Sequence, residues 1–232
     1  MDDKKEIKPY KSSEHTQKAI IDAAGKLAGQ NGFHNISTRA IADLAGENLG
    51  SIHYHFGGKT PLFMAVIDEA IADCLAFTAE DAIKPFQDEL DTPTGQAKAI
   101  RALINRHISK LFDPDKPTWH TKVIYQLLQN KSELQDYLKE KLIDKDSTTQ
   151  NNLIKRIMPE VSDLNIHMYS IVMTCPAFFH STNMEFILTI LGEKKFSKGY
   201  LAHLEDILVI QTLLLFNLPI DKKIDLNIDL GK

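Results

Sequence analysis

A short stretch bounded by an asparagine and two glycines constrains the fold of this chain more than any other. Residues 48–59 read NLGSIHYHFGGK. Asn48 can accept a backbone amide hydrogen and so begin a helix, and the pair Gly57-Gly58 supplies a left-handed stop. We therefore predict a helix of barely two turns, from Leu49 to Phe56.

Helical patterns flank this stretch on both sides. Apolar residues at helical spacing predict a first helix from Ser13 to Gln30. Ser37 can cap a second helix, which ends at Ala45-Gly46, and Pro61 suits the first turn of a fourth. The second and third helices are joined by residues 46–48, which is the spacing of a helix-turn-helix.

The two faces of the predicted short helix differ. On an ideal helix Ile52 and Phe56 share the inner face, and Gly50 and Tyr54 lie opposite with His53 beside them. A glycine inside a helix costs about 1 kcal/mol relative to alanine, so it needs a packing or binding reason. A helix in the major groove supplies one, because its backbone approaches a phosphate there. The pattern favours DNA binding.

Residues 32–63, with TRAIADLAG followed by GSIHYHFGGKTPLF, resemble the DNA-binding domain of the TetR (AcrR-like) family. That family's pattern reads T-x-x-I-A-x-x-A-G-V-S-x-G-x-L-Y-x-H-F-x-S-K. The chain departs from it at Glu47, Asn48, His53 and Gly58, where the family has valine, serine, an aromatic residue and serine. Further along, HTKVIYQLLQN and YSIVMTCPAFF are similar to the C-terminal domain of the CecR-like branch.

This resemblance implies an all-α homodimer that represses transcription. Such a protein binds a near-palindromic double-stranded DNA operator and leaves it when a small-molecule effector enters its C-terminal domain. We expect a three-helix DNA-binding domain at residues 1–60 and a larger helical effector-binding and dimerisation domain at residues 61–232, with about five helices beyond Pro85. The expected DNA contacts are Thr38, Arg39, Asn48, Leu49, Gly50, Ser51, His53, Tyr54 and Lys59.

The C-terminal part contains polar and soft side chains among apolar helices. Ligand pockets are mainly apolar with a few oriented polar groups, although many such side chains simply fill a core. The residues expected to line an effector cavity are His107, Leu111, Trp119, His120, Val123, Tyr125, Met168, Val172 and Cys175. We expect residues 162–191 and 199–216 to form the dimer interface, because the last helix is apolar nearly all round. A charge introduced there, as in Leu213→Glu, is expected to dissociate the dimer.

Composition narrows the function further. The net charge of −4 and pI near 6.1 exclude a uniformly basic nucleic-acid binder, so DNA binding must come from a local patch. Cys74 and Cys175 show no pairing pattern, and the N-terminal residues are too polar for a signal peptide. The longest apolar run, residues 207–216, is too short to span a membrane. These features predict a cytoplasmic protein.

Enzymatic and metal sites are not expected. His53 and His55 stand two positions apart, so they face different directions on a helix. Cys175 and His180 have poor geometry for a nucleophile and its base, and Pro176 disturbs that turn. We expect no catalysis, metal or cofactor. Two alternatives stay open: a constitutive DNA binder without an effector, and a helical small-molecule enzyme or carrier.

Overall fold

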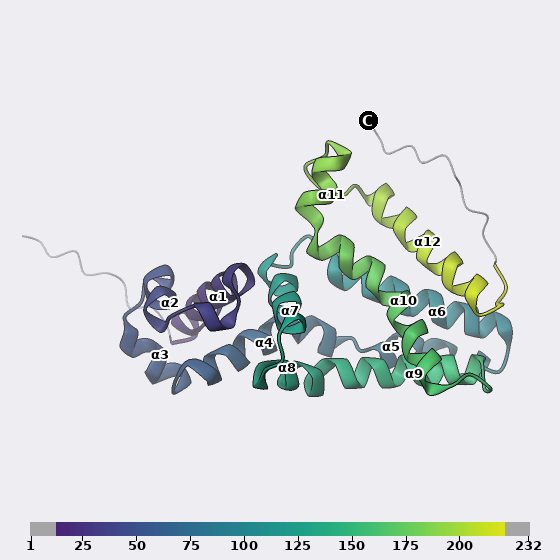
Figure 1. Ribbon diagram of the computed structural model, residues 1–232, viewed down its shortest axis with the longest axis horizontal. Helices are drawn as coiled ribbons and strands as arrows, with labels where there is room; N and C mark the ends of the chain where they lie inside the picture. The colour runs from purple at the N-terminus through teal and green to yellow at the C-terminus, as the bar shows by residue number, and fades with distance from the viewer. Residues whose placement is uncertain (1–12, 221–232) are drawn as a thin grey trace, which may run out of the picture. The chain divides into compact units, whose positions relative to one another are not determined.

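The computed structural model describes residues 13–220, and its regular structure in that range is entirely helical, as predicted (Figure 1). The α-helices are α1 (Ser13–Asn31), α2 (Thr38–Ala45), α3 (Leu49–Phe56), α4 (Lys59–Ala76), α5 (Ala79–Ile83), α6 (Pro93–Leu111), α7 (Trp119–Gln129), α8 (Glu133–Leu138), α9 (Asp144–Ile157), α10 (Asp163–Thr182), α11 (Met184–Leu191) and α12 (Lys198–Leu215). Two 3-10 helices, η1 (Phe33–Asn35) and η2 (Lys84–Glu89), and a π-helix, η3 (Lys139–Ile143), complete them.

The chain divides into two compact units. The N-terminal unit comprises the residues up to Ala70 together with Thr118–Gln135, and the C-terminal unit comprises Ile71–Pro117 and the residues from Asp136 onward. This division differs from the predicted boundary at residue 60, because α7 packs with the first helices. The functional assignment of residues 1–60 and 61–232 stays a prediction.

Three isoleucines hold the first helices together. Ile20 of α1, Ile41 of α2 and Ile52 of α3 are all fully buried. The predicted bounds of α3 are confirmed, and α1 ends one residue beyond the prediction. Complete burial of three large aliphatic side chains contributes about 1.5–3 kcal/mol for each one. The N-terminal unit is therefore built around these contacts.

Close packing of α7 on α1 depends on two glycines of α1. A methyl group at Gly25 would overlap the ring of Trp119, and one at Gly29 would lie 3.0 Å from Cβ of Lys122. Trp119 is only 4% exposed in this position. Glycine therefore allows the indole ring to lie directly against the backbone of α1, which brings residues 119–129 into the N-terminal unit.

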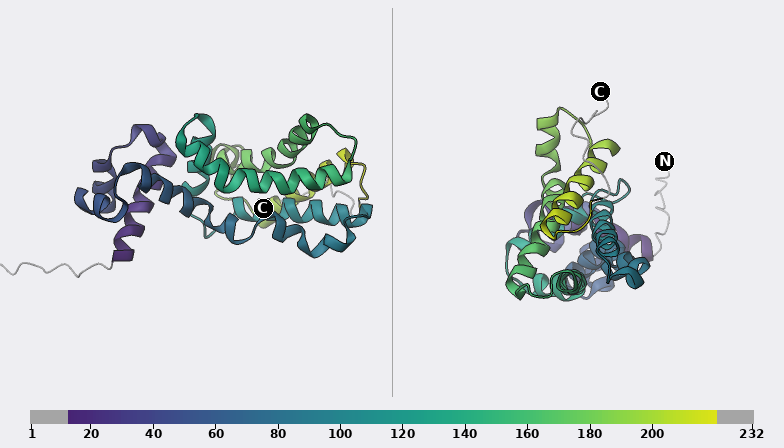
Figure 2. Two further views of the ribbon diagram at one scale, coloured as in Figure 1. Left: turned by 90° about the horizontal axis from the view of Figure 1, so that it is seen from below. Right: turned by 90° about the vertical axis from the view of Figure 1, so that its right-hand side faces the viewer.

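The C-terminal unit has one apolar core, formed where α6, α9, α10 and α12 pack together (Figure 1 and Figure 2). Arg106 of α6 is buried beside it and satisfies the last carbonyls of α4. Its guanidinium donates to the carbonyl oxygens of Phe77 at 2.7 Å and Cys74 at 3.0 Å, and to Asp146 of α9 at 2.9 Å. Orphan carbonyls at a helix end require such donors. Arg106 thus fixes the end of α4 to α6 and α9.

The expected number of helices after Pro85 was wrong. Seven α-helices lie between residues 93 and 215, whereas about five were expected. The sequence DKDS at residues 144–147 does not interrupt the helical backbone, and the chain continues from η3 directly into α9. Asp144 accepts from Lys139 at 2.8 Å, and the backbone keeps helical dihedrals at Asp144. A cluster of acidic residues at the first turn of α9 is compatible with a helix N-terminus.

Replacing Gly25 with alanine should destabilise the protein by about 1–3 kcal/mol, because overpacking outweighs the better helix propensity of alanine. Urea unfolding would measure this change. Combining Gly25→Ala with Trp119→Leu should recover part of the loss, as contacting residues show non-additive effects. Strictly additive effects would contradict the described contact.

Replacing Arg106 with methionine should cost about 3–5 kcal/mol, because it removes the buried cation paired with Asp146 and the donor to two carbonyl oxygens. Arg156 provides a matched control, since its partner Asp91 has a side chain 84% exposed. Arg156→Met should change the free energy of unfolding by no more than about 1 kcal/mol. Equal effects of the two variants, measured by urea unfolding, would refute the special role of Arg106.

Candidate nucleic-acid interface

Local interactions fix both ends of α3. The Oδ1 atom of Asn48 accepts from the amide of Ser51 at 2.9 Å, so the predicted cap is confirmed. Gly46 in the turn and Gly57 after the helix have φ of 65° and 77°, in the left-handed region. Glycine adopts that region without steric cost. The turn and the stop therefore set the length of α3 at eight residues.

The two faces of α3 have different surroundings, as predicted. Ile52 points into the unit and is fully buried, while Tyr54 is 84% exposed and Leu49 46%. His53 and Gly50 are also exposed, and Ser51 is half-buried. A side chain as large as tyrosine with this exposure makes few contacts within the chain. The outer face is thus accessible to a partner.

Gly50 lies beside the cap of α3 and away from the other helices that the structure describes. A Cβ atom there would lie 3.0 Å from Oδ1 of Asn48, the oxygen that caps α3. No other described helix comes within 4 Å of that position. The glycine in α3 is therefore not needed for contact with α1 or α2; it leaves room for the cap and keeps the outer face of α3 open to a partner.

Two basic residues lie at the starts of neighbouring helices. Arg39 is exposed in the first turn of α2, where Ser37 caps the helix by accepting from Ala40 N at 3.1 Å and Thr38 is half-buried. Lys59 opens α4, and its Nζ lies 5.4 Å from the ring centroid of Phe63. Helix N-termini favour anions. Both positions could hold phosphate groups.

Sequence reasoning missed how the turn is attached to α1. Glu47 accepts a hydrogen bond from the hydroxyl of Thr16 at 3.4 Å, and Thr16 is only 8% exposed. The two residues are 31 positions apart. No sequence pattern indicated this contact, because nothing in the sequence around Thr16 shows that its hydroxyl binds a residue of the later turn.

The structure does not gather the nine expected effector residues in one unit. Trp119, His120, Val123 and Tyr125 belong to the N-terminal unit. Trp119 and Val123 are buried, whereas Tyr125 is 39% exposed. The remaining five belong to the C-terminal unit. Their role in effector binding stays a prediction.

Three of those five residues lie on the exposed side of α10. Met168 is 52% exposed and Val172 42%, and Cys175 is exposed as well. His107 of α6 instead contacts the carbonyl oxygen of Thr174, with Nε2 at 3.2 Å. Burial lowers the pKa of His107 to about 4, despite this hydrogen bond. His107 is therefore neutral near pH 7. Its proton is on Nε2, which donates a hydrogen bond to the carbonyl oxygen of Thr174.

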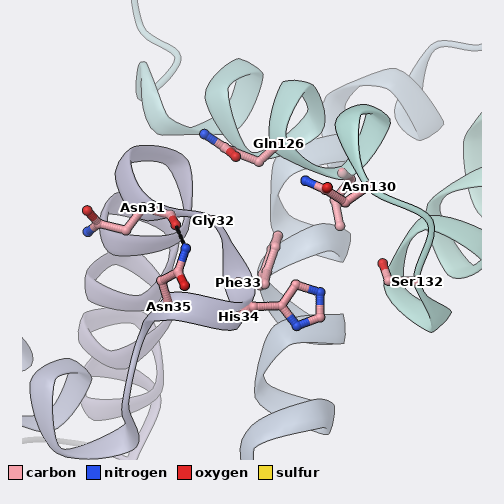
Figure 3. Close-up of a pocket in the computed structure, with 9 residues that line it drawn as sticks. Asn31, Gly32, Phe33, His34, Asn35, Gln126, Asn130 and Ser132 are labelled. Atoms are coloured by element: carbon pink, nitrogen blue, oxygen red, sulfur yellow. Dashed lines mark hydrogen bonds between the residues drawn. The ribbon is translucent and has the colours of Figure 1, made fainter.

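A small cavity lies in the N-terminal unit between η1 and the end of α7 (Figure 3). Its volume is about 80 Å³. Residues of these segments and their neighbours in the chain surround it, among them Asn31, His34, Gln126 and Ser132. Asn35 points back and donates to the carbonyl oxygen of Asn31 at 2.7 Å. The cavity is much smaller than the sites of about 300–1,000 Å³ that hold drug-sized ligands.

A larger groove of about 350 Å³ lies in the C-terminal unit between η2, α6, α12 and the residues after α12. Apolar side chains such as Phe86 and Leu213 line it. Charged groups at its edge are paired: Arg101 lies 3.5 Å from Asp206, and Asn105 donates to Glu205 at 3.1 Å. None of the expected effector residues lines this groove. The spacing of apolar residues on α6 did not indicate which face of the helix would border a groove.

Exposed apolar side chains are concentrated on α10, α11 and α12. The most exposed are Leu164 at 69%, Ile190 at 68%, Leu214 at 65% and Phe186 at 63%. Leu213 was the wrong test position for an interface, since it is 1% exposed and belongs to the core. Because α10 packs against both α11 and α12, these side chains lie on neighbouring helices and mark a candidate protein interface.

Comparison with known proteins identifies the N-terminal helices. Residues 20–66 match the family model described as bacterial regulatory proteins, tetR family. The N-terminal helices are similar to this family. The matched segment contains the whole of α2 and α3 and the first turns of α4, which are the elements whose geometry is described above.

Two curated relatives and one solved structure extend this likeness. The chain is 34% identical over 95 residues to the HTH-type transcriptional dual regulator CecR of Shigella flexneri, covering 41% of this chain and 40% of CecR. It is 30% identical over 126 residues to the HTH-type transcriptional regulator ArpR of Pseudomonas putida, covering 53% and 54%. The aligned regions thus span about half the length of these relatives or less.

The fold of most of the chain resembles a solved regulator. The transcriptional regulator FadR from Bacillus subtilis, crystallised in complex with stearoyl-CoA, aligns with 84% of this chain and 96% of its own, with a TM-score of 0.51 and 16% identity. At this identity the likeness concerns the fold alone.

Two searches of the described residues gave negative results. Between residues 13 and 220, no helix is both long and apolar enough to cross a membrane. The same part of the chain contains no group of three or more histidine, cysteine, aspartate or glutamate side chains placed to hold a metal ion.

Proposed function

We propose that this protein is a DNA-binding transcriptional regulator whose TetR-family domain reads double-stranded DNA with α3. The observation that carries the proposal is the outer face of α3, where exposed His53 and Tyr54 lie beside Gly50 and no other described helix comes within 4 Å of Gly50. A recognition helix in the major groove uses such a face, with its N-terminal half closest to the bases.

The contacts divide into two kinds. Arg39 and Lys59, together with Thr38 and the amides at the starts of α2 and α4, hold phosphate groups and position the domain. Residues of α3 read base edges: His53 and Tyr54 donate hydrogen bonds, and Leu49 makes apolar contacts. Asn48 and Ser51 orient the start of α3, and Gly50 lets its backbone approach the DNA.

The regulator acts as a two-fold symmetric homodimer on a near-palindromic operator. The exposed apolar surface of α10, α11 and α12 supports this arrangement, because a second copy would cover Leu164, Phe186, Ile190 and Leu214. Symmetry then repeats α3 in a second half-site, about one helical turn of DNA away.

The protein represses transcription until a small-molecule effector releases it from DNA. The groove of about 350 Å³ in the C-terminal unit supports an effector, since its volume lies in the range of ligand sites. FadR, which shares the fold, was crystallised with stearoyl-CoA. A constitutive binder is the second candidate, and it would lack any compound that changes its affinity for DNA.

Removing the phosphate contacts should weaken binding to specific and mixed-sequence DNA alike. Arg39→Ala and Lys59→Ala should each reduce the log–log salt slope by about 0.9 per phosphate contact in each protomer. Lys131→Ala, an exposed lysine of the same unit, is the control and should change neither quantity. His53→Ala and Tyr54→Phe should instead lower the preference for the selected operator. Uniform losses for all four variants, measured by fluorescence anisotropy, would exclude base reading by α3.

Placing a charge on the exposed apolar surface should dissociate the dimer. Leu214→Glu buries an unpaired carboxylate in the proposed interface, at a cost of several kcal/mol. Leu128→Glu, at a leucine 41% exposed in the N-terminal unit, is the matched control. Sedimentation should give a monomer for the first variant and a dimer for the second. A dimeric Leu214→Glu protein would place the interface elsewhere.

A further inference from the structure

The groove of the C-terminal unit holds more negative than positive charge once its ion pairs are included. Its lining residues are Phe86, Thr94, Ala97, Lys98, Arg101, Ala102, Asn105, Glu205, Leu213 and Pro219. The charged members are Lys98, Arg101 and Glu205, and the first two pair with Glu89 and Asp206. Two positive charges thus stand against three negative ones, a net charge of −1.

Both cations of the groove already have a carboxylate partner. Nζ of Lys98 lies 2.7 Å from Oε2 of Glu89, and Nη1 of Arg101 lies 3.5 Å from Oδ1 of Asp206. An anionic ligand would have to displace one of these carboxylates, and the displaced group would stay nearby as a like charge. The ion pairs therefore oppose the binding of an anion in this groove.

The third charged residue, Glu205 of α12, has a neutral partner instead. Its Oε2 accepts from the Nδ2 amide of Asn105 at 3.1 Å. In the part of the chain that the structure describes, this amide is the only group that pairs with the carboxylate. Glu205 is also half-buried, so water screens its charge less than that of an exposed side chain. A negative charge without a cation beside it therefore lines the groove.

Apolar side chains form the rest of the wall that a ligand would meet. Leu213 is 1% exposed, and Phe86 packs against the apolar core of the unit. The small side chains of Ala97 and Ala102 leave space along α6. Ligand sites commonly combine apolar walls with a few polar groups, and an aromatic ring such as that of Phe86 attracts ammonium groups placed over its face. The groove is thus complementary to an apolar body that carries one positive charge.

We propose that this groove binds a small organic ammonium ion, with its apolar body against Phe86 and Leu213 and its ammonium group donating to the carboxylate of Glu205. The inference rests on the effector site proposed above and names the chemical class of its ligand. Hydrogen bonds between two charged groups are about twice as strong as those between neutral groups. Asn105 holds the carboxylate through Oε2, which leaves Oε1 for the ligand.

The test compares three compounds that carry a phenyl ring and a functional group at opposite ends of a four-carbon chain: phenylbutylamine, phenylbutanol and phenylbutanoate. At about pH 7 the amine is positively charged, as a lysine side chain is, and the acid is negatively charged. Isothermal titration calorimetry measures the affinity of the full chain for each compound without DNA. The amine should bind about tenfold more tightly than the alcohol, which corresponds to about 1.4 kcal/mol, and the acid should bind most weakly.

Two substitutions of one residue test the carboxylate. Glu205→Gln removes the charge but retains an oxygen that accepts from Asn105, and it should bind the amine and the alcohol within about twofold of each other. Glu205→Lys should reverse the order, so that the acid binds more tightly than the amine. Urea unfolding checks the fold of both variants, and Glu205→Gln decides the result if Glu205→Lys is unstable.

Glu193→Gln is the matched control. It removes one negative charge from an exposed position of the same unit that does not line the groove. Because the net charge of the chain changes as it does in Glu205→Gln, a general electrostatic effect would appear in both variants. Glu193→Gln should retain the tenfold preference for the amine.

Four results would overturn the inference: equal binding of the three compounds, a preference for the alcohol or the acid, no binding of any compound, or a preference for the amine that survives in Glu205→Gln. Fluorescence anisotropy with operator DNA tests the proposed function separately. A preference for the amine that depends on Glu205, without any change in DNA affinity, supports the inference and overturns release by an effector. Absence of DNA binding overturns the proposed regulator and leaves the calorimetric result intact.

Discussion

Burial of Ile52 between α1 and α2 is the interaction on which the proposed DNA-reading surface depends. α3 has only eight residues, fewer than an isolated helix needs to be stable in water. Its inner face contributes a single fully buried side chain, and Asn48 and Gly57 satisfy its ends. Because one face carries the packing, the opposite face holds exposed residues such as His53 and Tyr54 that pack against no other helix the structure describes. Recognition of DNA by a short helix requires an inner face whose packing holds the helix in place and an outer face whose residues are available to the DNA.

Sequence reasoning predicted the elements whose causes are local. The bounds of α2 and α3 follow from residues close to them in the sequence. Each helix is capped by Ser37 or Asn48 and ends at a left-handed glycine, and these residues act within four positions of their partners. The contact of Gly25 with Trp119 joins residues 94 positions apart, and only the folded chain brings them together. That contact explains why residues 119–129 belong to the N-terminal unit rather than to the predicted C-terminal domain.

The candidate effector site was harder to predict for a related reason. An apolar helix pattern shows that a face is buried without saying which helix covers it. Leu213 and Leu214 are neighbours in sequence, yet one lies in the core and the other is 65% exposed. In the same way Met168 and Val172 were expected beside a cavity but lie on the exposed side of α10, while Thr94, Ala97 and Arg101 of α6 line the larger groove. The spacing of apolar residues on α6 did not indicate that the face with Thr94, Ala97 and Arg101 would line a groove.

Selection of bound sequences from a random duplex pool tests the central claim most directly. The claim is that two copies of α3, related by two-fold symmetry, read double-stranded DNA. The account predicts enrichment of a near-palindrome whose half-sites are about one helical turn apart, or a multiple of it, and loss of that enrichment when Tyr54 is replaced by alanine. A pool that shows no enriched sequence over repeated rounds, or the same palindrome selected by Tyr54→Ala, would contradict it.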